Sequence, residues 1–485
     1  MGEYSNRKCT CNSVTDKKMQ KEDNKVEATI GVFFDGTCNN KYNSMYTPHN
    51  RSSTNGFAKA GKRKVRIGDD CDGSYEGDLT NIAKLWETYT SSKEKRIDRV
   101  YIEGPGTEAP VKDMKSPYRD AEGWVSSNQD DVTAGFAYGI KDTGIFAKLE
   151  RACKLVTAKA AMLTKGLDAR QGVVLRLDLF GFSRGAAEAR LFVNMIGKSP
   201  SAYTENRDAD LDDALFRSMG MRVNIEVRFM GLFDTVLSYD NESWIIPSFD
   251  KYESRYDLQI GDKVKKAIHL VAADEYRKYF SLTTIDSAIK QGRGIGIVLP
   301  GAHSDIGGGY AEIVVEKMRD GCSRWNKYGL YRGFKNPEQL IQQGWITESW
   351  MPSSKNHGFF DYICSSWDDS RYVLNYYDRI PLHVMHHFME KESIPVDLEN
   401  LHRRCKINVR HKQLIEVRGC IMANVTSNKR GPYVLSNSEV VFCGNKQEGN
   451  LIKDVRFTFM HLSAHRGSFG AHGANEGNKR RIRSS

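Results

Sequence analysis

The stretch VVLRLDLFGFSRGAA, residues 173–187, joins a strand-like run of apolar residues to a run of good helix formers. At the junction stands GFSRG, residues 181–185, which has the Gly-x-Ser-x-Gly form of a nucleophile elbow. In such an elbow a buried strand carries the serine to the edge of a sheet, and the glycines permit a sharp turn and a closely packed helix. The order strand, turn, helix therefore predicts that Ser183 is the nucleophile of a hydrolase. An ordinary tight turn is the alternative.

Further strands and helices are expected to alternate along the chain. Apolar runs predict strands, and apolar residues at every third or fourth position predict helices. Such alternation is typical of an α/β fold with a mostly parallel sheet and helices on both faces, in which functional residues lie at the carboxyl ends of the strands. Residues 41–78 are polar and glycine-rich, and predict a long loop. The expected strands lie within 28–34, 99–107, 173–180, 224–236 and 294–300, and the expected helices are 81–89, 145–165 and 264–275.

Composition indicates a globular chain with one large core or two ordinary ones. The chain has 485 residues, of which 40% are hydrophobic and 27% charged. No apolar run approaches the roughly 18 residues of a membrane span, and residues 1–25 have no apolar segment typical of a secretory signal. We therefore expect synthesis in the cytosol, and export, if any, by another machine.

The ten cysteines are scattered, and only Cys9 and Cys11 stand close together, without a second pair at zinc spacing. Reduced thiols are expected. His383, His386 and His387 have helical spacing that could present them to a metal, but no acidic partner completes such a site. Satisfied or exposed histidines are the preferred interpretation, so neither a metal nor another cofactor is expected.

Five segments are expected along the chain. Residues 1–25 are expected to be disordered, 26–318 to form the catalytic core, 319–445 to form an aromatic-rich helical cap or insertion, 446–465 to supply a final core strand, and 466–485 to form a disordered basic tail. The tail carries part of the net charge of +10 and is interpreted as solvated, with binding to anionic lipid or nucleic acid as the alternative. Some aromatic and apolar side chains of the cap could contact acyl chains, although a core of the cap itself is preferred: Trp350, Met351, Phe359, Phe360, Tyr362 and Trp367.

A serine nucleophile needs a base to take its proton and an acid to orient that base. Asp234, in GLFDTV, ends a predicted strand and is the preferred acid, with Asp305 as the alternative. His303, in GAHSDIGGGY, follows another strand and is the preferred base. His461 is the alternative base, because it would directly follow the last strand.

The oxyanion of an acyl-transfer intermediate needs backbone N–H donors. One is expected from Arg184, the residue after the nucleophile. The other is expected from the loop FDGT, residues 34–37, through Gly36 or Thr37. Asp35 is expected to fix this loop by hydrogen bonding rather than to take part in the chemistry.

Four motifs in this order, GVFFDGTCNN, LDLFGFSRGAAEARLF, GLFDTV and PGAHSDIGGGY, resemble a bacterial α/β-hydrolase family that contains the first family of type VI secretion lipase effectors. The resemblance spans about residues 28–312. It implies an α/β-hydrolase fold, and a serine esterase with the triad Ser183, Asp234 and His303. For the effectors it also implies phospholipase A activity on membrane glycerophospholipids, and delivery by a contractile machine into the periplasm of a neighbouring cell.

The partners expected from this resemblance are membrane phospholipid, a secretion spike or adaptor protein and a cognate immunity protein, with no nucleic acid. The second hypothesis is a soluble carboxylesterase resident in the cytosol. The third is a binding module for anionic lipid that has lost catalysis.

Overall fold

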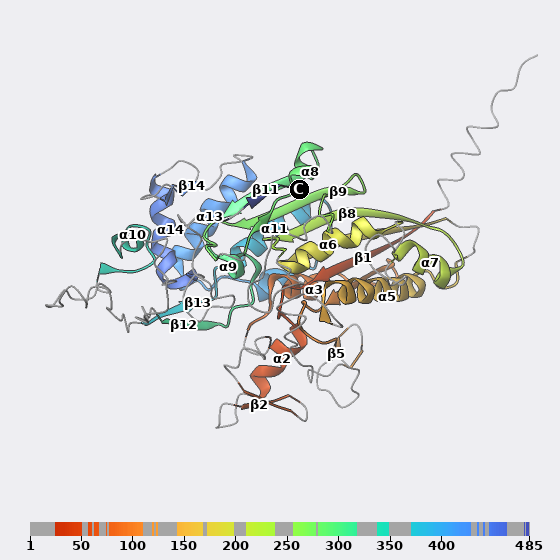
Figure 1. Cartoon of the computed structure of the whole chain (residues 1–485), viewed down its shortest axis with the longest axis horizontal. Helices are drawn as coiled ribbons and strands as arrows, with labels where there is room; N and C mark the ends of the chain where they lie inside the picture. The colour runs from red at the N-terminus through yellow and green to blue at the C-terminus, as the bar shows by residue number, and fades with distance from the viewer. Residues whose placement is uncertain are drawn as a thin grey trace, which may run out of the picture.

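In the computed structural model (Figure 1) most of the central and C-terminal chain is described. The described residues are 25–50, 57–60, 63–66, 74, 77–109, 119–120, 123–124, 143–167, 172–197, 210–237, 256–277, 280–317, 337–348, 370–427, 434–435, 440–441, 446–462, 480 and 482–484. Cys9, Cys11 and the six aromatic and apolar residues between 350 and 367 therefore lie outside the described residues. Among those described, no helix is both long enough and apolar enough to cross a bilayer.

The centre of the molecule is a six-stranded sheet in which every neighbouring pair of strands is parallel. This confirms the predicted α/β class. The spatial order is β11-β9-β8-β7-β1-β4. The strands are β1 (Val26–Phe34), β4 (Ile97–Ile102), β7 (Val173–Phe182), β8 (Val223–Phe233), β9 (Val264–Ala272) and β11 (Gly294–Leu299).

The strand order reverses direction at β1. The chain passes from β1 to β4 on one side, and then returns to place β7, β8, β9 and β11 successively on the other side. In open α/β sheets, the crevice outside the carboxyl ends of the strands at such a reversal is where ligands bind. Here it lies between the end of β1, where FDGT begins, and the end of β7, where GFSRG begins.

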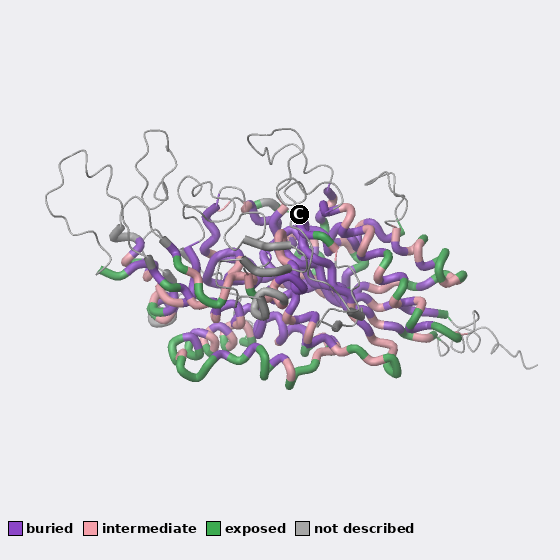
Figure 2. The backbone as a smooth tube through the Cα atoms, turned by 90° about the horizontal axis from the view of Figure 1, so that it is seen from below, coloured by how far each residue is buried: buried purple, intermediate pink, exposed green. Residues whose placement is uncertain are grey.

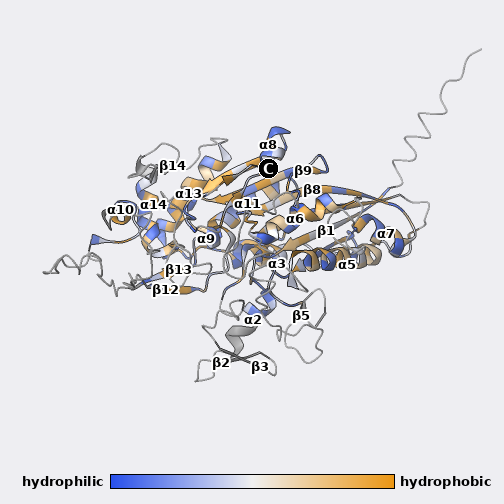
Figure 3. Ribbon diagram, in the orientation of Figure 1, coloured by the Kyte–Doolittle hydropathy of each residue, from blue (hydrophilic) through white to orange (hydrophobic). Residues whose placement is uncertain are grey.

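Helices cover both faces of the sheet because successive side chains of a strand point to opposite faces. Phe33 belongs to one apolar core and Phe34 to the other. The second core is shared with α5 (Ile145–Leu163), α6 (Arg184–Met195) and α7 (Leu211–Met219), and the first with α3 (Asn81–Thr88) and α11 (Arg379–Lys391). Figure 2 shows buried residues along the sheet and on the helix faces turned to it. Figure 3 shows the strands as the most hydrophobic ribbons.

The region expected to form a helical cap is mainly helical where it is described. Of its helices, α10 and α13 lie towards the end of the molecule opposite α7 and α11 lies beside the sheet (Figure 1); their apolar side chains extend the core that contains Phe33. Its elements are α10 (Pro337–Gln342), β13 (Ser370–Leu374), α11, α12 (Leu398–Arg404), α13 (Lys412–Thr426), β14 (Val434–Leu435) and β15 (Val440–Val441). Strand β13 pairs antiparallel with β12 (Ile313–Lys317) of the core segment.

The remaining elements are short, apart from the helix α2. The prediction of a long loop over residues 41–78 is wrong in part, because this ten-residue helix and a two-stranded ribbon lie in it. These elements are α2 (Lys41–Asn50), β2 (Phe57–Ala60) and β3 (Arg63–Arg66); the others are β5 (Arg119–Asp120), β6 (Gly123–Trp124), β10 (Leu282–Thr283), α8 (Asp286–Lys290), α9 (His303–Gly307) and β16 (Ile482–Arg483).

The prediction of a helix over residues 264–275 is wrong, because residues 264–272 form β9, a strand of the central sheet. A strand that is covered on both faces is a continuous apolar run without alternation, which periodicity cannot distinguish from a buried helical segment. Six successive residues, 267–272, are buried here.

The prediction of a final core strand at 446–465 is also wrong. Residues Lys446–Phe459 form the helix α14, which packs against α13 and β13. Ile452, Val455 and Phe459 are buried at spacings of three and four, which is the period of a helix. On the same helix, Arg456 forms an ion pair with Asp274 at 2.8 Å, which ties α14 to the loop after β9.

The expectation of disorder over 466–485 does not hold for the described end of that segment. Residues 482–483 form β16, which pairs in parallel with β10, and the side chain of Arg480 is 7% exposed and forms an ion pair with Asp234. Residues 463–479 lie outside the described part of the chain.

Candidate active site

Ser183 occupies the turn between β7 and α6, with φ 57° and ψ −125°. Positive φ strains a residue with a side chain, and such strain is typical of a nucleophile elbow. A Cβ atom on Gly185 would lie 2.3 Å from the carbonyl oxygen of Asp35, so only glycine lets α6 approach the end of β1 this closely. The backbone N–H of Ser183 donates to the carbonyl of Phe233 at 3.0 Å, which fixes the elbow beside the end of β8.

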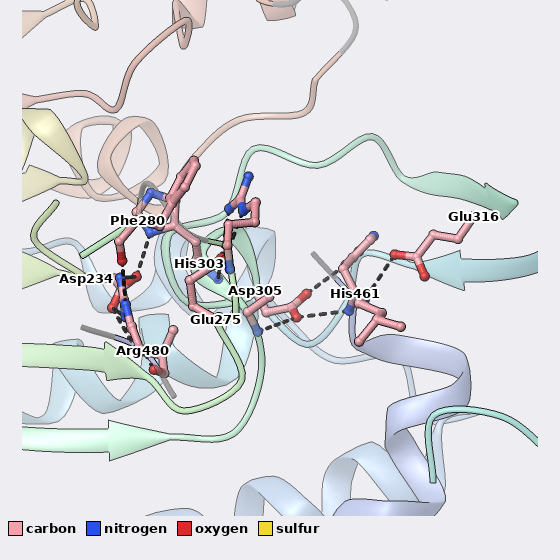
Figure 4. A network of polar contacts seen from close by, with 12 residues as sticks. Asp234, Glu275, Phe280, His303, Asp305, Glu316, His461 and Arg480 are labelled. Carbon is pink, nitrogen blue, oxygen red and sulfur yellow. Dashed lines mark hydrogen bonds and ion pairs between the residues drawn. The ribbon is translucent and has the colours of Figure 1, made fainter. Parts of the chain in front are cut away.

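Asp234 follows β8 directly and His303 begins α9 after β11, so both come to the same sheet edge as Ser183. The Nδ1 atom of His303 lies 2.5 Å from Oδ2 of Asp234 (Figure 4). Asp234 has φ 44°, and its Oδ1 accepts a hydrogen bond of 2.9 Å from the backbone N–H of Ala272. This is the geometry in which an acid fixes the tautomer and orientation of a catalytic base.

The electrostatics suit a neutral imidazole beside an ionised carboxylate. Burial would raise the pKa of Asp234, but the charge of Arg480 and the contact with His303 hold this pKa well below its usual range. Burial, which disfavours the imidazolium ion, lowers the pKa of His303 although Asp234 opposes the shift. His303 is therefore unprotonated at neutral pH, as a general base must be.

The rings of Phe182 and His303 are 4.6 Å apart between centroids, which brings the histidine to the residue that precedes Ser183. Within the described part of the chain, no hydrogen bond joins Oγ of Ser183 to His303, and Nε2 of His303 has no other partner. Such nucleophile-base contacts are often long in unliganded enzymes and tighten when substrate binds.

The loop after β1 is built around the buried carboxylate of Asp35. This carboxylate accepts hydrogen bonds from the Gly36 N–H and the Thr80 hydroxyl, both at 2.8 Å, and from the Tyr101 hydroxyl at 2.6 Å. Burial raises the pKa of Asp35 to about 6. The expected structural role of Asp35 agrees with these contacts.

These contacts also bear on the expected oxyanion donors. The N–H of Gly36 is directed to Asp35, so that donor is already engaged in this structure. Thr37 accepts a 2.6 Å hydrogen bond at its hydroxyl from Nε of Arg184, which ties the loop to the elbow. The described hydrogen bonds include none from the Thr37 N–H, which keeps Thr37 as a candidate donor beside the N–H of Arg184.

The alternative acid and base, Asp305 and His461, pair with each other. His461 Nδ1 lies 2.7 Å from Asp305 Oδ1 (Figure 4). The histidine ring stacks on Tyr310 with centroids 3.7 Å apart. Asp305 also accepts hydrogen bonds from the backbone N–H groups of Ala302 and His461. This pair joins α9 to the end of α14, and the geometry favours His303 over His461 as the base.

Several buried residues around the dyad have no motif that could have revealed them. Glu275 accepts a 3.3 Å hydrogen bond from the His303 N–H and is paired with Arg277 at 2.8 Å. The Nε2 atom of His269, in β9, accepts from the Thr235 N–H at 3.0 Å, and burial lowers the pKa of this histidine to about 3. Prediction of β9 as a helix hid the position of His269 next to the acid.

Of the three histidines on α11, His383 has both ring nitrogens in contact with other protein groups. His383 lies 3.1 Å from the carbonyl oxygen of Cys405 through Nε2, and accepts a 2.8 Å hydrogen bond from Arg418 at Nδ1. Across the described residues, no group of three or more His, Cys, Asp or Glu side chains is arranged to hold a metal ion.

We expect the pH dependence of ester hydrolysis to report the lowered pKa of His303. Protonation of this histidine removes the base, so kcat/KM should fall as pH decreases, with a midpoint below the ordinary imidazole value of 6.5. The measurement is kcat/KM against pH with an ester whose own ionisation lies outside the range. A midpoint above 6.5 would contradict burial as the dominant influence on His303.

Comparison with known proteins bears on the family and the fold of this chain. A family model described as "T6SS, Phospholipase effector Tle1-like, catalytic domain" matches residues 198–326. That range contains Asp234 and His303 but begins after Ser183, and is shorter than the range of about 28–312 expected from the motifs. No curated protein matches the chain.

Among solved structures, one is similar in fold, and another matches more weakly. A structure of the Tle1 effector bound to the VgrG spike from the type VI secretion system has a TM-score of 0.54 and 19% identity, over 95% of this chain and 94% of that chain. An uncharacterised protein from Pseudomonas aeruginosa has a TM-score of 0.36 and 17% identity, over 86% of this chain and 53% of the other.

The family model and the Tle1 structure confirm the resemblance predicted from the sequence: this chain is similar to the Tle1-like phospholipase effectors of type VI secretion, in sequence over residues 198–326 and in fold over nearly its whole length.

Proposed function

We propose that this protein is a serine-dependent lipase that hydrolyses acyl esters of membrane glycerophospholipids. Ser183 attacks the ester carbonyl, His303 takes the serine proton and later gives it to the leaving alcohol, and Asp234 orients His303 and stabilises its charged form. Water then releases the fatty acid from the acyl-enzyme. The N–H groups of Arg184 and Thr37 are the proposed donors to the oxyanion.

One observation carries this proposal. A serine in a strained elbow shares a sheet edge with a buried Asp–His pair whose atoms are 2.5 Å apart. Neither the turn nor the pair alone would indicate catalysis, because both occur as structural features. Their meeting at the strand ends beside the chain reversal is what an acyl-transfer site requires.

The phospholipid substrate and the route of delivery are proposed from the relatives. The matching family model describes phospholipase effectors, and the Tle1 effector in the similar structure is bound to a VgrG spike. We infer that this protein is also carried by a secretion spike, acts in the periplasm of a target cell, and is neutralised in the producer by an immunity protein.

The test of substrate class is hydrolysis by purified wild-type protein. Mixed phosphatidylethanolamine and phosphatidylglycerol vesicles are compared with a short-chain soluble ester, and products are resolved by mass. Free fatty acid and lysophospholipid are the expected products, and the lysophospholipid identifies the acyl position that is cut. Cleavage of the soluble ester alone would replace the lipase with a soluble carboxylesterase, and no hydrolysis of either would favour a binding module.

A further inference from the structure

The segment 480–484 lies along residues 280–286, immediately beside the Asp–His pair. Strand β16 pairs in parallel with β10, with Leu282 opposite Ile482. At the far end of the segment the hydroxyl of Ser484 donates to Asp286 at 2.5 Å. Figure 1 accordingly places the end of the chain near α8.

At the near end, the guanidinium of Arg480 binds the proposed catalytic acid with both of its terminal nitrogens. Nη1 lies 2.6 Å from Oδ1 of Asp234 and Nη2 lies 2.8 Å from Oδ2 (Figure 4). Nε donates to the carbonyl oxygen of Phe280 at 2.7 Å. The ring of Phe280 in turn contacts the ring of His303 edge-on, with centroids 5.0 Å apart.

These contacts saturate the carboxylate of Asp234. Oδ1 receives the N–H of Ala272 and one nitrogen of Arg480, and Oδ2 receives the other nitrogen and faces His303. A bidentate arginine fixes the plane of a carboxylate, which a single hydrogen bond does not. Rotation of the Asp234 side chain would break all of these contacts at once.

We propose that Arg480 is a positioning residue for the hydrolytic reaction: its guanidinium holds the carboxylate of Asp234 in the orientation that presents Oδ2 to His303. This proposal rests on the function proposed above. The contacts of Arg480 with other described residues include none with Ser183, so it acts through Asp234. The segment 480–484 thereby becomes part of the active site, although 246 residues separate Arg480 from the acid that it holds.

Arg480 is also a positive charge next to the pair that must stabilise an imidazolium ion. The charged groups that face His303 are Asp234, Glu275 and Arg277, while Arg480 faces it across Asp234. Neutral His269 is a further neighbour of Asp234, and its Nε2 accepts from the Thr235 N–H. Removal of the Arg480 charge should therefore make protonation of His303 easier and raise the pKa of this histidine.

The experiment compares wild type with two variants. Arg480→Gln removes both the positive charge and the planar guanidinium that binds Asp234 through two nitrogens. Arg480→Lys keeps the charge but loses this planar group. Ser484→Ala is the matched control, because it weakens the docking of the same segment without touching Asp234. Two measurements need no lipid turnover. The titration of the His303 imidazole is followed by NMR with labelled histidine, and the rate of Ser183 labelling by a fluorophosphonate is followed against pH.

For Arg480→Gln we expect a raised His303 pKa, and labelling at neutral pH slower by on the order of 10²-fold, as misplacement of a catalytic group causes. Arg480→Lys should titrate like wild type yet label more slowly, because charge survives and orientation does not. Ser484→Ala should match wild type in both measurements.

An unchanged His303 titration and labelling rate in Arg480→Gln would overturn the proposal. So would equal slowing in Ser484→Ala, because that result would assign the effect to docking of the segment. Failure of the proposed function has a different signature: wild type would leave phospholipid intact, while the NMR titration would still decide whether Arg480 acts on the Asp234–His303 pair.

Discussion

Ser183→Ala is expected to lower kcat/KM for phospholipid hydrolysis by roughly 10⁴- to 10⁶-fold, the range found when a serine hydrolase loses its nucleophile. Alanine keeps the backbone of the elbow and removes only the Oγ atom that would form the acyl-enzyme. Binding of lipid should persist, because no other side chain changes. The measurement is release of fatty acid from phosphatidylethanolamine and phosphatidylglycerol vesicles, with vesicle binding measured in parallel.

The matched control is Ser287→Ala. Ser287 lies in α8, away from the elbow, and its hydroxyl accepts a hydrogen bond of 2.9 Å from the N–H of Ile260, which precedes β9. Its replacement should leave hydrolysis within a few-fold of wild type, as substitutions away from the chemistry usually do. Hydrolysis by Ser183→Ala at a tenth of the wild-type rate or more would show that another group attacks the ester, and would remove the elbow from the mechanism.

The elbow could be predicted because its determinants are local. A strand, two glycines and a helix former follow one another in GFSRG and its flanks, and these residues alone predict the turn. The contacts with Phe233 and Asp35 that hold the turn come from distant parts of the chain. The positions of Asp234 and His303 at strand ends were also predictable, because apolar runs precede both. The distance of 2.5 Å between Asp234 Oδ2 and His303 Nδ1 depends on the order of the strands in the sheet, which could not be predicted from the sequence.

Pairing could not be predicted because it depends on which strands are neighbours. Two acids and two histidines remained as candidates, and the structure sorts them into Asp234 with His303 and Asp305 with His461. Prediction of a strand before His461 made that residue resemble the base after a last core strand. The helix α14 explains its position differently, because the chain just after this helix brings His461 to Asp305 of α9.

Arg480 shows a further limit of sequence reasoning. A glycine-rich basic segment has the composition expected of a disordered tail, and no motif in RRIRSS predicts a contact with the active site. Its partner is a buried carboxylate on a distant strand end, and burial of that charge makes the contact energetically important. The composition of a segment predicts only its average tendency to be ordered, whereas the charge of Asp234 fixes the position of one residue, Arg480.

His303→Ala and His461→Ala are expected to fail in different ways. His303→Ala should lower kcat/KM by on the order of 10⁴-fold, because Ser183 loses its base. The loss of folding free energy should be modest, because Asp234 keeps Arg480 as its partner. His461→Ala should instead cost about 2 kcal/mol of unfolding free energy, because the buried carboxyl of Asp305 loses its side-chain hydrogen-bond partner.

The measurements are urea unfolding and vesicle hydrolysis per folded molecule for each variant. Folded His461→Ala should retain hydrolysis within about tenfold of wild type, since α9 still carries His303. The opposite pattern, with activity lost in His461→Ala and kept in His303→Ala, would make Asp305 and His461 the catalytic pair. The structure argues against that outcome, because the ring in contact with Phe182, the residue before the nucleophile, belongs to His303.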